Sequence, residues 1–416
     1  MPILSNIQRR TVTGRVLLGA FYVVLIFGAC GMVYPFLLMV AGSFKTAVDL
    51  HEVDIVPRFL TDREALFRKY CEQRYGKIPE FMAATRSQNS TGQWLYSYKN
   101  LALPESSERM ICDWEQFLGE ARGRWPSYYW SLGHVHALRG ISELTYQYIQ
   151  SLKEAFPHAP RIEFEVALTS EGWQSQNYRM PQGSYGEVYR KFRNRLSPRY
   201  FYPVSVEGSY AAEFLTAAYG NGPDGAVRLD QDFGTNYRSP LEAELPPSIP
   251  AGHKERELWE RFVRDYLSPR FIHYDAALLP AYRAFLEGKY SDIAALNHAY
   301  GTSSAQWTEV EFPTPSQMQE SRLNDLTAFQ RNLPSLDGLH IQSPDFEWRK
   351  WLDQKYGGDL EALNQAWGTH YVMWGRIQMP LLAYDGVQLD RHKESILWDY
   401  LTRNYKFAWD QIVGNS

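Results

Sequence analysis

The stretch that decides the fold is LEALNQAWGTHYVMWGRIQMP, residues 360–380, because two diluted copies of it occur in the same chain. Residues 293–314 read IAALNHAYGTSSAQWTEVEFPT, and residues 226–247 read AVRLDQDFGTNYRSPLEAELPP. All three contain a Leu followed by a polar residue, an aromatic residue followed by Gly-Thr, and a Pro at the end. Such self-similarity is typical of stacked structural units that share a core.

Each copy closes a longer module, and the modules span residues 188–247, 258–314 and 325–380. In each, one amphipathic helix ends at a Leu-Pro or Leu-Ser-Pro break, because Pro cannot continue a helix. A second helix carries Phe or Trp beside Leu, and a short third helix precedes Gly-Thr. We therefore predict tandem helical modules over residues 181–403. Fainter fragments occupy residues 66–84 and 396–412.

The repeated aromatic residues have two interpretations. Apolar side chains recur at three- and four-residue spacing, which is typical of the packed face of a helix. Alternatively, exposed Trp rings stack on sugars or contact a partner protein. The candidate side chains for carbohydrate or partner contact are Trp307, Trp351, Trp367 and Trp374.

The N-terminal region predicts a membrane anchor. Residues 16–43 contain no charged side chain, and about 20 apolar residues suffice to cross a bilayer as a helix. Basic side chains precede this segment, and acidic ones follow Lys45. The positive-inside rule then places residues 1–15 in the cytoplasm and the bulk of the chain outside the plasma (inner) membrane. The bilayer is thus the first expected partner.

Two alternatives for this segment are a cleaved signal peptide and a lipoprotein modified at Cys30. The apolar run is too long for a signal-peptide core, and the chain stays apolar after Cys30, which a mature lipoprotein should not do. The other cysteines are Cys71 and Cys112, and a disulfide between them remains open. Three cysteines are too few for a disulfide framework.

The composition favours a folded, mainly α protein. Of 416 residues, 44% are hydrophobic and 15% are aromatic, which is enough to bury a core. The formal net charge is −4 and no long basic run exists, so we expect no nucleic-acid partner. Residues 50–180 are expected to be helical, with a short strand at 161–173. Because no alternating strand–helix pattern occurs, an α/β barrel is not expected.

The sequence contains no recognisable catalytic constellation. A glycosidase needs two carboxyl groups, and the candidates are Glu163, Glu165, Glu171 and Glu207, but nothing in the sequence brings two of them together. His134 and His136 lack a third metal ligand. No phosphate loop, Rossmann glycine motif or nucleophile elbow is present. We predict no catalytic residue, cofactor or metal.

Residues 7–46, IQRRTVTGRVLLGAFYVVLIFGACGMVYPFLLMVAGSFKT, resemble the first membrane helix of maltose-type carbohydrate ABC-transporter permeases. The matching positions are Pro35 and Phe36 and the exit Ser43 to Thr46. Residues 404–416, NYKFAWDQIVGNS, resemble the segment that leads to the second membrane helix of those proteins. The resemblance implies that residues 50–403 are a large extracytoplasmic insertion between these two helices. It also implies a second permease subunit, an ATPase subunit and a solute-binding protein as partners. The coupling loop of the family is absent from residues 1–416.

A second resemblance covers residues 348–369, WRKWLDQKYGGDLEALNQAWGT, which are similar to a helical stretch of β-galactosidase-like glycoside hydrolases. The similarity is confined to helix packing positions and includes no catalytic glutamate. It implies an alternative function, a membrane-anchored protein that binds or cleaves carbohydrate. A structural scaffold is a third alternative.

Overall fold

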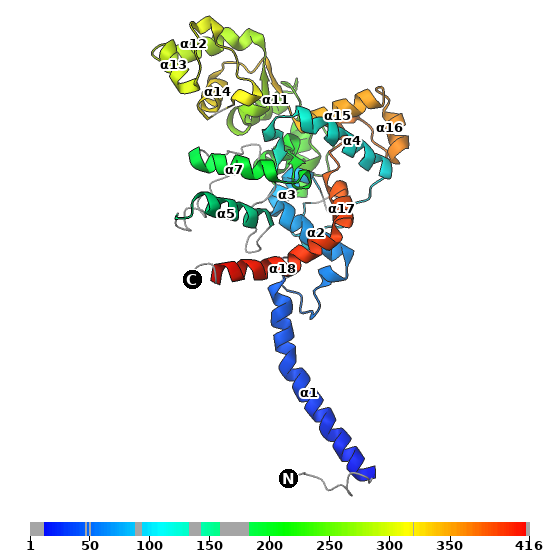
Figure 1. Cartoon of the computed structure of the whole chain (residues 1–416). Helices are drawn as coiled ribbons and strands as arrows, with labels where there is room; N and C mark the ends of the chain where they lie inside the picture. The colour runs from blue at the N-terminus through cyan, green and yellow to red at the C-terminus, as the bar shows by residue number, and fades with distance from the viewer. Residues whose placement is uncertain are drawn as a thin grey trace. The chain divides into compact units, whose positions relative to one another are not determined.

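In the computed structural model, the described residues are 12–45, 48–49, 51–87, 94–132, 143–158, 183–318 and 320–412. Over these ranges the chain is mainly helical, and its strands form two small two-stranded sheets (Figure 1). The predicted mainly α fold with little strand is therefore confirmed. The chain divides into two compact units, residues 1–69 with 394–416, and residues 70–393.

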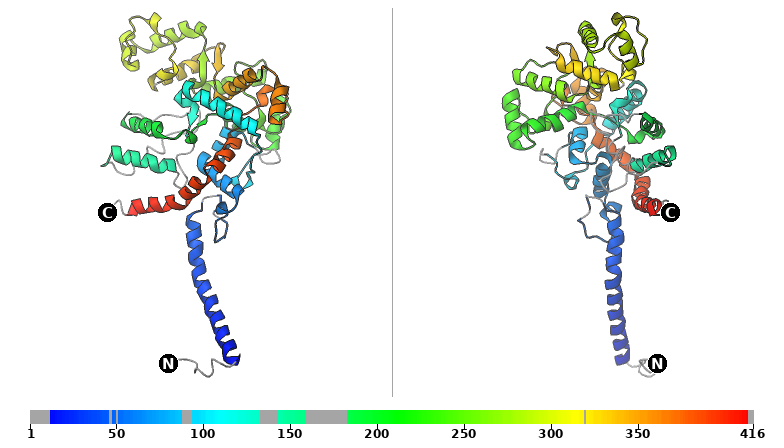
Figure 2. Two further views of the ribbon diagram at one scale, coloured as in Figure 1. Left: turned by 45° about the vertical axis from the view of Figure 1, so that its right-hand side comes forward. Right: turned by 90° about the vertical axis from the view of Figure 1, so that its left-hand side faces the viewer.

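The first unit contains the membrane-helix candidate. Helix α1 (Val12–Ser43) is one continuous helix (Figure 2). Within it, Leu18–Ser43 is long and apolar enough to cross a bilayer, with a mean hydropathy of 2.4. Its 26 residues extend about 39 Å at a rise of about 1.5 Å per residue, more than the roughly 30 Å of a bilayer core. The structure thus contains a helix where the sequence predicts a membrane span.

Lys69 links three parts of this first unit. Its Nζ donates to the carbonyl oxygen of Phe44 (2.8 Å), directly after α1, and pairs with Asp49 (3.2 Å). It also lies 4.5 Å from the ring centroid of Phe59, in the turn η2 (Arg58–Leu60). The same ammonium lies 5.8 Å from the ring of Tyr400, in helix α18 (Lys393–Ile412). Residues from both ends of the chain therefore share one buried cation.

The second unit is built from short helices and tight turns. Helix α2 (Arg63–Tyr75) enters it. Its later α-helices are α3 (Ile78–Thr85), α4 (Glu108–Arg124), α5 (Glu143–Ala155), α7 (Gly183–Arg195), α8 (Val206–Gly208), α9 (Thr216–Tyr219), α10 (Pro223–Phe233), α11 (His253–Arg261), α12 (Leu279–Lys289), α13 (Ile293–Tyr300), α14 (Glu320–Asn332), α15 (Pro344–Lys355), α16 (Leu360–Trp367) and α17 (Leu381–Arg391).

Single turns and two π-helical segments connect these helices. They are η3 (Tyr98–Asn100), η4 (Ser127–Tyr129), η5 (Pro198–Tyr200), η6 (Ser209–Leu215), η7 (Pro240–Glu242), η8 (Phe262–Tyr266), η9 (Pro269–Phe271), η10 (Ala276–Leu278), η11 (Trp307–Glu309), η12 (Pro315–Gln317) and η13 (Trp374–Arg376). The π-helical segments are η6 and η8.

The four strands each follow a helix and a proline. They are β1 (Trp130–Ser131), β2 (Tyr202–Pro203), β3 (Ile272–Tyr274) and β4 (Leu339–Ile341), after α4, α7, η8 and α14 respectively. Strands β1 and β2 pair antiparallel, as do β3 and β4. The sequence does not predict these strands, because two or three residues are too few to show alternation. The predicted strand at 161–173 lies outside the described residues, as does the predicted boundary at 180–181.

Each repeated Gly-Thr stretch forms the C-terminal cap of a helix. Helices α10, α13 and α16 all end at a glycine in the left-handed region, with φ of +67°, +63° and +70°. Glycine suits this position because it has no Cβ to clash. Four residues earlier, a side-chain oxygen accepts from the threonine hydroxyl at 2.8–3.0 Å; these residues are Asp230, Asn297 and Asn364. The repeated Gly-Thr stretch is therefore a helix cap.

The helix pairs are joined by buried carboxylates. Asp325 on α14 accepts from the hydroxyls of Tyr290 (2.7 Å) and Tyr300 (2.8 Å), at the ends of α12 and α13. Accordingly, α12 and α13 both pack on α14 (Figure 2). Asp113 on α4 likewise accepts from the Tyr356 hydroxyl and from the Trp367 indole (2.9 Å). These carboxylates join each helix pair to a further helix.

A third junction of this kind extends the pattern to the N-terminal side of the unit. Asp385 on α17 accepts from the Tyr75 hydroxyl at 2.5 Å and pairs with Arg74 at 3.0 Å. Both of these partners lie at the C-terminal end of α2, and α17 also packs on α3. Asp385 therefore joins α17 to the region of the faint sequence fragment at residues 66–84.

Candidate functional site

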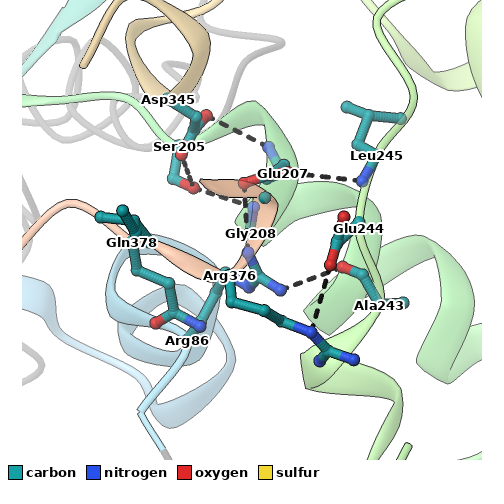
Figure 3. Close-up of polar contacts among 12 residues, drawn as sticks. Arg86, Ser205, Glu207, Gly208, Ala243, Glu244, Leu245, Asp345, Arg376 and Gln378 are labelled. Carbon is teal, nitrogen blue, oxygen red and sulfur yellow. Dashed lines mark hydrogen bonds and ion pairs between the residues drawn. The ribbon is translucent and has the colours of Figure 1, made fainter. Parts of the chain in front are cut away.

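A dense group of charges surrounds Glu207, one of the sequence candidates, in the described part of the second unit (Figure 3). Its side chain is 1% exposed. Arg349 on α15 binds both carboxylate oxygens, with Nη1–Oε2 at 2.7 Å and Nη2–Oε1 at 3.0 Å. Arg86 contributes a third ionic hydrogen bond, 3.1 Å from Oε2. Two guanidinium groups thus neutralise one buried carboxylate, and such charge-assisted bonds are the strong ones.

Arg86 occupies an unusual backbone position. It caps α3 with φ of +50°, and it is the one non-glycine residue with positive φ among those the structure describes. Glycines cap the equivalent helices α10, α13 and α16. A left-handed conformation costs an ordinary residue about 1–2 kcal/mol. The side chain offsets this cost, because it also donates to the carbonyl oxygens of Leu241 and Ala243, each at 3.0 Å.

Asp345 lies behind Glu207 and caps the first turn of α8. Its carboxylate accepts from Ser205 Oγ at 2.7 Å and from the backbone N–H of Val206 at 2.9 Å. It also accepts from the backbone N–H of Glu207 at 3.3 Å (Figure 3). Burial raises the pKa of Asp345, and the neighbouring charge of Glu207 adds to this rise. Asp345 therefore aligns the turn that carries Glu207.

Close backbone packing holds this turn in place. A Cβ on Gly208 would lie 1.7 Å from the carbonyl oxygen of Ala83 in α3, so only glycine fits there. An outer ion pair joins Arg376 to Glu244 at 3.1 Å (Figure 3). The Arg376 guanidinium also lies over the Tyr237 ring. The cluster thereby ties α3, α8, the 241–245 segment, α15 and η13 together.

The chemistry of this arrangement is that of a structural ion-pair network. Both oxygens of Glu207 accept from guanidinium groups, so its lone pairs are directed at protein donors. Asp345 is likewise engaged by the turn it caps. A glycosidase uses one carboxyl as an acid and another as a nucleophile or base, and both must face the substrate. The contacts of Glu207 and Asp345 favour a role in joining modules.

The candidate tryptophans lie in two kinds of environment. Trp367 is buried, and Trp351 is half-buried; both pack on Trp348, with ring centroids at 6.0 and 5.6 Å. The indole of Trp351 also donates to Glu120 at 2.9 Å. These contacts support the packing interpretation for α15 and α16. Trp307 and Trp374 are half-buried and begin the turns η11 and η13. Their contact with carbohydrate or a partner stays a prediction.

The remaining sequence candidates lie outside the described residues. They are His134, His136, Glu163, Glu165 and Glu171. In the parts of the chain that the structure describes, no group of three or more His, Cys, Asp or Glu side chains is placed to hold a metal. Cys71 is buried and Cys112 is exposed, and both are free thiols.

The sequence points to Glu207 but not to the side chains that bind it. Arg86 and Arg349 are 121 and 142 residues away along the chain, so no local pattern connects them. One signal was available at Arg86. Arg86 comes shortly after the faint fragment at residues 66–84, directly behind a short helical stretch. The three clearer copies have a glycine at the corresponding position. An arginine at a position that favours glycine indicates that its side chain makes stabilising contacts.

Comparison with known protein families, curated proteins and solved structures finds no match to this chain.

Proposed function

We propose that this chain is a permease component of a carbohydrate ABC transporter of the plasma (inner) membrane. In this proposal, α1 is the first membrane helix and residues 70–393 form an extracytoplasmic insertion. The main support for this proposal is the division of the chain into two units. Residues 1–69 and 394–416 belong to one unit, although they lie at opposite ends of the sequence. An insertion between two membrane segments is expected to leave its flanking residues together in this way.

The contacts of Lys69 add detail to this proposal. The ammonium group connects Phe44, at the exit of α1, with Phe59 and Tyr400. A buried lysine costs free energy unless it is paired, and Asp49 supplies the opposite charge. Lys69 would therefore hold the returning segment α18 beside the end of the first membrane helix.

The insertion is the part that distinguishes this chain from a permease core. We expect it to contact the solute-binding protein or the glycan on the outer side of the membrane. Its helices are joined by buried ion pairs, which suits a rigid surface for a partner. The expected further partners are the second permease subunit and the ATPase subunit.

The sidedness of the insertion can be measured with its native cysteines. Cys112 on α4 is exposed, whereas Cys71 is buried and serves as an internal control. A membrane-impermeant maleimide applied to intact spheroplasts should label Cys112, and Cys112→Ser should remove the label. Labelling that requires disruption of the membrane would place the insertion in the cytoplasm and overturn the proposed orientation.

Transport itself needs a separate test. Cells that lack this chain should lose uptake of one member of a panel of radiolabelled oligosaccharides and recover it on complementation. Affinity purification in detergent should also retain an ATP-binding subunit. Unchanged uptake across the panel, together with no co-purified ATPase, would exclude the permease assignment.

The alternative is a membrane-anchored glycoside-hydrolase-like protein, which the similarity of residues 348–369 favours. The structure assigns those residues to α15 and α16, where Trp348, Leu352 and Trp367 are buried. Release of p-nitrophenol from a panel of nitrophenyl glycosides by the purified chain would support this alternative.

A further inference from the structure

A second polar cluster lies on the outer face of the β3–β4 sheet. His273 and His340 are cross-strand partners between buried neighbours, and their rings lie 6.3 Å apart. His340 Nδ1 lies 2.7 Å from Ser248 Oγ, and His340 Nε2 lies 3.2 Å from Asp275 Oδ2. A serine, a histidine and a carboxylate thus form one hydrogen-bonded chain.

Backbone hydrogen bonds fix the positions of Ser248 and Asp275 beside His340. The N–H of Ile341 donates to the carbonyl oxygen of Pro247 at 2.7 Å, which places Ser248 beside β4. Asp275 donates its N–H to the Gly338 carbonyl oxygen at 2.9 Å. Gly338 has φ of +84°, and a Cβ there would lie 3.3 Å from the Asp275 Cβ. Glycine therefore permits the close approach that brings Asp275 to the imidazole.

The hydrogen bonds select one tautomer of His340. A carboxylate only accepts, so Nε2 carries the proton that is donated to Asp275. Nδ1 then holds the lone pair and accepts from the Ser248 hydroxyl. The His340 and Asp275 side chains are 42% and 44% exposed, so these hydrogen-bonded side chains are accessible to solvent. The fully engaged, buried carboxylates around Glu207 differ from them in this respect.

We propose that Ser248 is a nucleophile toward carboxylic esters, with His340 as its general base and Asp275 as the residue that orients the imidazole. A nucleophile, a base and an orienting group within hydrogen-bond reach are the side chains that activate a serine for acyl transfer. This proposal is independent of the transport assignment.

The reaction balances without a cofactor. As Ser248 Oγ bonds to the acyl carbon, its proton passes to Nδ1 of His340. The ester C–O bond then breaks, and the departing alcohol takes that proton. Water then attacks the acyl-serine and gives a proton to Nδ1 of His340. The acyl C–O bond to Ser248 breaks, the serine oxygen takes that proton, and a carboxylic acid is released. The net reaction is ester plus water to acid plus alcohol.

The test uses the full chain in detergent micelles with a fluorescent fluorophosphonate, which phosphonylates activated serines. We expect labelling of the native protein that heat denaturation abolishes, with the adduct mapped by peptide mass spectrometry to Ser248. Ser248→Ala should abolish labelling, and His340→Asn should slow it by about 10²-fold or more, as for loss of a general base.

The matched control is Ser335→Ala. The Ser335 hydroxyl bonds to the carboxylate and the backbone N–H of Asp337, and no imidazole contacts it among the residues that the structure describes. Labelling of this variant should equal that of the unmodified chain. Absence of labelling on the native protein, or an adduct mapped to another serine, would overturn the proposal. Mass spectrometry of the labelled native protein identifies the modified serine, so the proposal can be tested even if a variant does not fold.

Discussion

At the scale of single residues, the charges around Glu207 show how a buried ion pair constrains its own backbone. Arg86 keeps a left-handed conformation that glycine would adopt without strain, because its guanidinium binds Glu207 and two carbonyl oxygens. Strain of this kind persists only where the surrounding contacts outweigh it. The network is therefore sensitive to the loss of its central charge.

Glu207→Gln should destabilise the fold strongly. It would leave the guanidinium groups of Arg86 and Arg349 buried without their counter-charge, and removal of one partner of a buried pair costs about 3–5 kcal/mol. Urea unfolding followed by circular dichroism measures the free energy of unfolding. Glu361→Gln, on the exposed surface of α16, is the matched control and should leave the midpoint unchanged. Equal midpoints for both variants would contradict the structural role of Glu207.

Asp345 predicts a pH dependence of stability. Because burial and Glu207 raise its pKa in the folded state, the folded chain binds this proton more tightly than the unfolded chain. The contribution of protonated Asp345 to the free energy of unfolding is complete below the ordinary Asp pKa of about 3.9. It is lost as the pH rises through the raised pKa of the folded state. Asp345→Asn should remove that decline.

The measurement is urea unfolding of both proteins from about pH 4 to 7, the range above the ordinary Asp pKa. The difference in unfolding free energy between variant and parent should grow in favour of the variant as the pH rises. A constant difference would show that Asp345 does not titrate in the folded state over this range.

At the scale of elements, the modules depend on how each short helix ends. The caps at Gly234, Gly301 and Gly368 combine a left-handed glycine with a side-chain oxygen that binds the following threonine. An eight-residue helix such as α13 is marginal in isolation. Its cap and its contact with α14 must therefore supply most of its stability.

Gly301→Ala and Gly288→Ala should have opposite effects. Gly301 has φ of +63°, so alanine there carries about 1 kcal/mol or more of strain. Gly288 lies inside α12 and is exposed, and a Cβ added to it would meet nothing within 4 Å. Alanine at this position should therefore stabilise the fold by about 0.5–1 kcal/mol. Thermal unfolding of the two variants checks this. A destabilised Gly288→Ala would contradict the helical geometry of α12.

At the scale of the whole molecule, the division into two units predicts independent folding of the insertion. Residues 62–393 include all of α2 and the second unit with its buried aromatic core and ion-pair network. Expressed without α1, this fragment should be soluble, helical and cooperative in urea unfolding. Aggregation, or unfolding without a transition, would show that the insertion depends on the membrane-proximal unit.

The parts of the fold that could be predicted from sequence are those with local causes. The absence of charge over residues 16–43 predicts a long apolar helix, and α1 has that form. The Leu-Pro breaks and the Gly-Thr stops predict helix ends, which the structure places at α14 and at the three glycine caps. The short strands β1 to β4 lacked such a cause, since pairing with a distant strand defines them.

The sequence by itself determined that this chain is mainly helical and has one N-terminal apolar helix able to span a bilayer. Helix periodicity, proline breaks and glycine caps act within a few residues, so they can be read along the chain. The tertiary structure alone decided which charges meet. Glu207 joins Arg86 and Arg349, and Ser248 joins His340, across separations of 92 residues or more in the sequence. Such contacts depend on how the modules pack, which no local pattern encodes.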